Sequence, residues 1–199
     1  MSIKQKNSPN VTCLTSNNLK KLKSFGVKYI KPKLTPNQQN KINKNCILCN
    51  LYKTRTNVIL DESSSKIMVI NFSPTKKEDI SGKCDKEKIL NMINVKDIYL
   101  TYILKCHHSN SQINPKICIQ HLFNEIYTIK PKLIIALGKN VFDSLGLKNF
   151  TIFRGMMLDF YGFKLISSYN FEFVDKNPNV KNDFLQDINN INQYIKGMQ

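Results

Sequence analysis

The chain has 199 residues, a length that fits one compact domain with a short extension. Hydrophobic residues make up 41% of it, and no apolar run reaches the roughly 18 residues of a membrane span, so no membrane association is expected. Thirty Lys and Arg against fourteen Asp and Glu give a net charge of +16, which favours a nucleic acid partner through phosphate contacts. An AT-rich genome would also raise the Lys content, but it would not explain the shortage of acidic residues. The start of the chain has no secretory signal, so we expect an intracellular, soluble protein of the cytoplasm, nucleoid or nucleus.

The first 44 residues are rich in Lys and Asn and poor in large apolar side chains, which predicts a flexible basic arm. Apolar residues at helical spacing predict one short amphipathic helix within it, with a solvated tail as the alternative. Pro32 and Pro36 are expected to break any helix near the end of the arm. The expected helix has Leu19, Leu22 and Phe25 on its apolar face beside Lys20, Lys21 and Lys23, three lysines that we expect to contact DNA.

From residue 45 to residue 199, β-rich runs alternate with helical patterns, which predicts one α/β domain. Near-continuous apolar runs such as residues 133–138 suit a mostly parallel sheet that is buried on both faces. Pro115 fits the first turn of a helix, and Pro131 is expected to end that helix. Strands are expected at 66–71, 98–105, 133–138 and 163–168, and helices at 85–94, 115–129, 139–145 and 180–195.

Four cysteines form a candidate metal-binding set. Cys46 and Cys49 make a C-x-x-C pair, while Cys106 and Cys118 lie near the end of an expected strand and in the next helix. Six cysteines in an intracellular chain indicate metal binding before disulfides. Four thiolates suit either tetrahedral zinc or an iron-sulfur cluster, and the spacing does not separate the two.

The remaining cysteines and the histidines leave other readings open. A redox C-x-x-C is disfavoured because no strand precedes the pair. A mixed Cys and His zinc site stays open, because three histidines lie near Cys106 and Cys118. Otherwise His107 and His108 are expected in a loop that faces phosphate, His121 on a helix surface, and Cys13 and Cys84 as free thiols.

Several short motifs follow one another in a distinctive order after the C-x-x-C pair. They are Pro74, Glu78, Asp79, Gly82, Tyr99, Thr101, Lys105, Cys106, Cys118, the run Lys130, Pro131 and Lys132, Ile134, the run Ala136, Leu137 and Gly138, and the pair Arg154 and Gly155. In this order they resemble the family 4 uracil-DNA glycosylases, over residues 46–199. The resemblance implies a three-layer α/β/α fold with a central four-stranded, mostly parallel sheet. It also implies a 4Fe-4S cluster, rather than zinc, on Cys46, Cys49, Cys106 and Cys118.

The chain departs from this family at four places that serve uracil excision. The resemblance assigns a water-positioning carboxylate to the position of Phe72, a base-reading asparagine to Tyr102 and a base-contacting histidine to Asn170. A segment with a stacking aromatic ring is missing between Gly82 and Cys84. Phenylalanine cannot accept a proton, and tyrosine lacks the paired donor and acceptor of an amide, whereas the Asn170 amide still offers a donor. We therefore expect uracil excision to be lost.

The leading hypothesis is a non-catalytic DNA-binding accessory protein of DNA replication or repair, with a DNA polymerase or another replication or repair protein as partner, by analogy of fold. One alternative is an active divergent glycosylase, a hydrolase of the N-glycosidic bond of uracil or another damaged base. It would use Glu78 and Asp79, which otherwise simply occupy a helix N-terminal turn. The other alternative is a metal-stabilised protein-interaction module. In the domain, DNA contacts are expected at Lys105, His107, His108 and Arg154.

Overall fold

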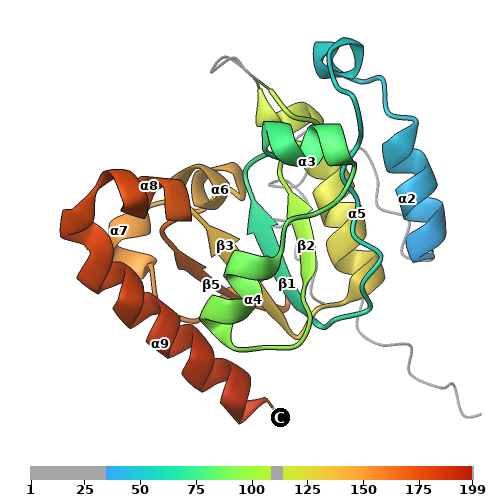
Figure 1. Ribbon diagram of the computed structural model, residues 1–199. Helices are drawn as coiled ribbons and strands as arrows, with labels where there is room; N and C mark the ends of the chain where they lie inside the picture. The colour runs from blue at the N-terminus through green and yellow to red at the C-terminus, as the bar shows by residue number, and fades with distance from the viewer. Residues whose placement is uncertain (1–34, 109–113, 199) are drawn as a thin grey trace, which may run out of the picture.

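The computed structural model describes residues 35–108 and 114–198, and a five-stranded sheet with helices on both faces lies at its centre (Figure 1). The expected three-layer α/β/α fold is confirmed, with five strands instead of four. The strand order is β2-β1-β3-β5-β4, in which β4 alone is antiparallel to its neighbour. The strands are β1 (Ile67–Asn71), β2 (Tyr99–Tyr102), β3 (Leu133–Leu137), β4 (Leu158–Phe160) and β5 (Phe163–Ser168).

The fifth strand escaped sequence reasoning because β4 has only three residues. It joins β5 through the two-residue turn Tyr161-Gly162, in which both residues have positive φ, of 51° and 87°. Such turns match the twist of a β-hairpin, and glycine takes this conformation without strain. The expected strand at 98–105 is shorter than predicted, because β2 ends at Tyr102.

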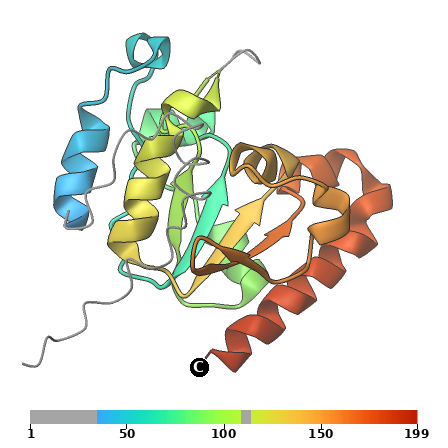
Figure 2. The same ribbon diagram turned by 180° about the vertical axis from the view of Figure 1, so that it is seen from behind.

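Alternate residues of the strands supply two separate cores. On one face, Met68 and Ile134 pack against Leu122 and Ile126 of α5 (Ile119–Ile129). On the other face, buried side chains such as Val69 and Ile135 pack against α4 (Glu87–Ile93) and α9 (Lys181–Gly197). Figure 2, seen from behind, shows α5 in front of the sheet and α9 beyond it. This two-sided burial explains why the strands are apolar throughout.

The end of the expected basic arm is helical. Helix α2 (Pro36–Lys44) begins at Thr35, whose side chain accepts a hydrogen bond from Gln38 N in a capping box. The prediction that Pro36 breaks a helix is wrong, because Pro36 stands in the first turn, where a missing N–H costs nothing. Helix α2 lies beside α5 in both views (Figure 1, Figure 2). The helix predicted around residues 19–25 lies outside the described residues.

The predicted helices at 85–94, 115–129, 139–145 and 180–195 are confirmed, the second as a 3-10 turn followed by α5. Two short helices, α7 (Phe150–Phe153) and α8 (Phe171–Lys176), were not expected. They are too short for a helical period to show in sequence. The remaining elements are η2 (Asn50–Lys53), α3 (Lys76–Ser81), η3 (Pro115–Ile117), α6 (Lys139–Ser144) and η4 (Pro178–Val180).

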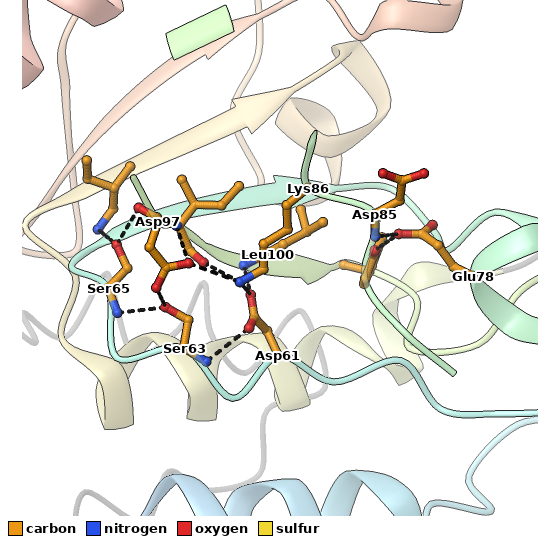
Figure 3. Close-up of polar contacts among 11 residues, drawn as sticks. Asp61, Ser63, Ser65, Glu78, Asp85, Lys86, Asp97 and Leu100 are labelled. Atoms are coloured by element: carbon orange, nitrogen blue, oxygen red, sulfur yellow. Dashed lines mark hydrogen bonds and ion pairs between the residues drawn. The ribbon is translucent and has the colours of Figure 1, made fainter. Parts of the chain in front are cut away.

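A polar network holds the segment before β1 against the start of β2 (Figure 3). The buried Asp61 carboxylate accepts hydrogen bonds from Leu100 N at 2.6 Å and Ser63 N at 3.0 Å, and pairs with Lys86 Nζ at 2.7 Å. Lys86 also reaches Asp97 at 3.3 Å. Burial tends to lower the pKa of Lys86, but the two carboxylates raise it overall.

Across residues 35–108 and 114–198, every helix is too short or too polar to cross a membrane.

Candidate functional site

A cleft of about 810 Å³ opens at the carboxyl ends of the parallel strands. Asn71 and Phe72 line it from the end of β1, Leu137 from the end of β3, and Asn170 from the segment after β5. Helices α3, α6 and α8 supply further walls. Ligands of open α/β sheets bind at this edge, so the cleft is the candidate functional site.

The charge of the cleft is opposite to that of the chain. Among the residues that the structure describes, five carboxylates and one lysine, Lys88, line it. Three of the carboxylates form exposed ion pairs with lysines. Exposed ion pairs of this kind contribute little to the stability of a fold. The lining therefore does not form a cationic groove for phosphate. The five carboxylates belong to Glu78, Asp85, Asp143, Glu172 and Asp175.

Phe72 stands where the family resemblance places a catalytic carboxylate. Its ring meets the His108 ring edge-on, with 6.0 Å between the ring centroids. Neither ring nitrogen of His108 has a hydrogen-bond partner among the residues that the structure describes. His107 Nδ1 lies 3.0 Å from the Pro74 carbonyl oxygen. An apolar ring and two loop histidines thus occupy this part of the cleft wall and the loops beside it.

Tyr102 is buried beneath the cleft and is 1% exposed. Its hydroxyl donates a short hydrogen bond to Glu78 Oε1, which also accepts Asp85 N at 2.9 Å. The other Glu78 oxygen completes a capping box by accepting Thr75 N at 2.8 Å (Figure 3 shows Glu78 beside Asp85). Burial, together with the nearby negative charges, raises the pKa of Tyr102, so its phenol stays protonated as a donor. Glu78 is therefore a structural carboxylate of α3.

Asp79 is also occupied by the fold. Its carboxylate accepts hydrogen bonds from Thr56 N and Asn57 N, each at 3.1 Å. Burial tends to raise the pKa of Asp79, but these backbone hydrogen bonds lower it overall. Both members of the acidic pair lie in the first turn of α3, as the structural interpretation of their sequence position predicted.

The four candidate metal ligands come from three segments. Cys46 follows α2, Cys49 caps η2, Cys106 follows β2 and Cys118 begins α5. Burial, together with the nearby Cys49, Cys106 and Cys46 side chains, raises the pKa of Cys118 to about 12, in keeping with four neighbouring thiols. Within the described ranges, no group of three or more His, Cys, Asp or Glu side chains has the arrangement of a metal site.

The Arg55 guanidinium and the His121 imidazole contact two of these thiols. Arg55 Nη1 donates to Cys106 Sγ at 3.4 Å and to the Cys46 carbonyl at 2.8 Å. His121 Nε2 lies 3.2 Å from Cys46 Sγ. The prediction of His121 on a helix surface is wrong: the ring is buried, and burial lowers its pKa to about 4. Sequence reasoning missed Arg55, whose only signal was its place six residues after Cys49.

Lys105 and Arg154, two residues expected to contact DNA, form ion pairs with carboxylates of the fold. Lys105 is 2% exposed, and its Nζ lies 2.7 Å from Glu125 Oε2 and 2.5 Å from Thr101 Oγ1. Arg154 pairs with Asp183 and Asp187 of α9, each at 2.7 Å. Burial opposes the charge of Arg154, but the pairing carboxylates raise its pKa overall.

Asn170 and Cys84 are the remaining predicted residues that the structure describes. Asn170 Oδ1 accepts Phe173 N at 2.8 Å and so caps α8, while its amide nitrogen faces Gly138 at the cleft. Cys84 is a free thiol, as expected, and burial raises its pKa to about 12. Cys13 and the arm lysines Lys20, Lys21 and Lys23 lie outside the described residues.

Comparisons with known proteins agree with this architecture. A family model described as the uracil DNA glycosylase superfamily matches residues 15–191. A Type-4 uracil-DNA glycosylase of Saccharolobus solfataricus is 29% identical over 148 residues, which are 62% of this chain and 68% of the relative. One of Pyrobaculum aerophilum is 29% identical over 110 residues, 48% of this chain and 56% of the relative. One of Thermotoga maritima is 26% identical over 174 residues, 77% of this chain and 91% of the relative. Because the family model covers most of the chain and the fold has the expected layers, the chain belongs to the uracil-DNA glycosylase superfamily.

Proposed function

We propose that this chain is a DNA-binding member of the superfamily that does not excise uracil. In this role it assists DNA repair or replication, with a DNA polymerase or another repair or replication protein as its partner. The observation that carries the proposal is the position of Tyr102, which is buried at the end of β2 and bonded to Glu78. The base-reading amide of the family would stand at this position, and here no polar group of that residue faces the cleft.

Two further observations support the loss of excision. Phe72 offers no carboxylate to orient an attacking water, and an apolar ring lines the cleft in its place. The replacement carboxylates Glu78 and Asp79 already accept hydrogen bonds from the backbone of the fold. A phosphate backbone would also meet a lining rich in carboxylates. Recognition and activation of a flipped base are thus both unsupported by the cleft.

The proposal includes a 4Fe-4S cluster on Cys46, Cys49, Cys106 and Cys118. Four neighbouring thiols are the donor set of such clusters, and bound thiolates would be stabilised by the Arg55 cation beside Cys106. A cluster would hold α2, the end of β2 and the start of α5 together. Anaerobically purified protein is expected to be brown, with about four iron and four sulfide per chain. Stoichiometric zinc without iron would contradict this.

Cys46→Ala tests the same cluster through stability. Loss of a ligand forfeits binding energy that is coupled to folding, so the melting temperature and the iron content should both fall. Cys84→Ala is the matched control, because Cys84 lies outside the four-thiol set and should leave the iron content unchanged. An unchanged melting temperature and iron content in Cys46→Ala would overturn the assignment.

A uracil-release assay tests the loss of excision. The wild-type protein is incubated with single- and double-stranded DNA that contains one uracil, and abasic sites are detected by strand cleavage. The Type-4 enzyme of Thermotoga maritima serves as positive control. We expect no release above a no-enzyme control. Clear release would favour the second candidate, a divergent glycosylase, which the retained cleft of about 810 Å³ keeps open.

A further inference from the structure

The positive charge of the chain is concentrated at one end of the sequence. Residues 1–60 contain twelve of the thirty Lys and Arg residues and none of the fourteen Asp and Glu residues. The described part of this segment, residues 35–60, comprises α2, the C-x-x-C loop, η2 and the segment that follows η2. Its exposed lysines are Lys41, Lys44 and Lys53, and none of them forms an ion pair within the part of the chain that the structure describes.

The same loop exposes large apolar side chains. Ile47 and Leu48, which lie between the two cysteines, are 69% and 53% exposed. Tyr52 is 40% exposed, and Lys53 Nζ lies 5.9 Å from the centroid of its ring. Consecutive exposed aliphatic residues at a loop tip have no role in the core, so they indicate a contact surface.

A second segment extends this surface. Lys116 and Ile117 are exposed in η3 and directly precede Cys118, the thiol that neighbours Cys46 and Cys49. Elements η2 and η3 lie at the same end of the molecule as α3, the end toward which the parallel strands point (Figure 1, Figure 2). The cleft opens at this edge of the sheet, but its own lining is acidic.

We infer that the cysteine loop, with Lys44, Ile47, Leu48, Lys53 and Lys116, is the DNA-contacting surface of this protein. This inference rests on the proposed function and names the face that performs it. The lysines pair with phosphates, and the aliphatic tip presses against base edges or separates a base step, as apolar wedges do in proteins that bind the minor groove. A partner with negative charge along its length matches a segment without a single carboxylate.

The two kinds of contact give different signatures in DNA binding by the full-length protein. Fluorescence anisotropy with a 20-base-pair duplex and with its single strand measures affinity across a salt series. Lys44→Gln with Lys53→Gln should lower the slope of log affinity against log salt by about 1.8 on duplex DNA, and should weaken binding roughly 60-fold at 0.1 M salt. Ile47→Ser with Leu48→Ser should weaken binding about tenfold at every salt concentration and leave the slope unchanged.

The matched controls are exposed residues outside the proposed DNA-contacting surface. Ile152 of α7 is 66% exposed, so Ile152→Ser removes an equally exposed aliphatic side chain. Lys181→Gln with Lys196→Gln removes two exposed charges from α9, whose C-terminal end lies opposite the loop (Figure 1). Both controls should bind DNA with at least half the wild-type affinity. Melting temperature and iron content, equal to wild type, verify the folding of every variant.

The outcomes separate the inference from the proposed function. If the wild-type protein binds neither the duplex nor the single strand at low salt, both the proposed function and the assigned DNA-contacting surface are overturned. If the wild type binds DNA in a salt-dependent way, and the loop variants and the α9 variant weaken binding equally, the assignment of the DNA-contacting surface is overturned. The proposed function then stands. Binding that is weakened only in the loop variants, in the two signatures described, supports the surface.

Discussion

The phenol of Tyr102 and the carboxylate of Glu78 are joined by a hydrogen bond in the interior, where β2 ends and α3 begins. The carboxylate caps its own helix through Thr75 and accepts the backbone of Asp85 as well. Tyr102 thus holds the end of a strand and the start of a helix together. Because Tyr102 is engaged in this buried pair, we expect its substitution to change the stability of the fold.

Tyr102→Phe should lower the free energy of unfolding by about 1–2 kcal/mol, because it removes one hydrogen bond to a buried carboxylate. Tyr102→Asn should cost more, about 3–5 kcal/mol, since it also leaves a cavity in the core. Urea denaturation measures both changes, with Tyr52→Phe on the exposed tyrosine as control. Adding Phe72→Glu to Tyr102→Asn should not restore uracil release. Recovery of release would show that the position still reaches the cleft.

The buried pair of Lys105 and Glu125 should be a stability determinant. Lys105→Met leaves the Glu125 carboxylate uncompensated in the interior, and breaking such a pair costs about 3–5 kcal/mol. Lys105→Met combined with Glu125→Gln should recover part of this loss, because no charge remains unpaired. Urea denaturation of the two variants gives the comparison. A Lys105→Met protein of wild-type stability with weakened DNA binding would return Lys105 to the DNA-contacting residues.

Asp79 should make stability depend on pH in the acidic range. Its folded-state pKa is lowered, so the stability it contributes is present above the unfolded value of about 3.9 and is lost as pH falls through the folded-state pKa. At pH 7, Asp79→Asn should cost about 1.5–3 kcal/mol, the range for hydrogen bonds to a charged group. The difference from wild type should shrink as the pH falls below about 4. Asp159→Asn, on an exposed aspartate, should show neither effect.

Removal of residues 1–34 tests the predicted basic arm and leaves every residue that the structure describes in the chain. The deletion ends just before Thr35, the cap of α2, so the contact of α2 with α5 is kept. The salt slope of duplex binding should fall by about 0.9 for each phosphate that Lys20, Lys21 and Lys23 neutralise in the full-length protein. The melting temperature should stay within a few degrees of wild type. An unchanged slope would mean that the arm does not touch DNA.

Chain patterning determined the fold and the set of candidate residues. Apolar runs near residues 67, 99, 133 and 163 predicted all four parallel strands, because a strand buried on both faces must be apolar throughout. The order of motifs along the chain identified the positions of Phe72, Tyr102 and the four cysteines, because that order can be read from the sequence alone. Pro36 misled because a proline can begin a helix as well as break one, and only the capping box at Thr35 distinguishes the two.

The tertiary structure alone decided which charged groups are available. Lys105 and Arg154 look like any other basic residues in sequence, but their partners Glu125 and Asp187 are 20 and 33 residues away along the chain. Likewise, the helix that carries His121 turns this side chain toward Cys46, which is 75 residues distant. Desolvation and pairing depend on these long-range contacts, and no local pattern encodes them. For that reason, the sequence identifies the charged residues of this protein, and only the folded chain shows which of them are paired inside the fold and which remain exposed.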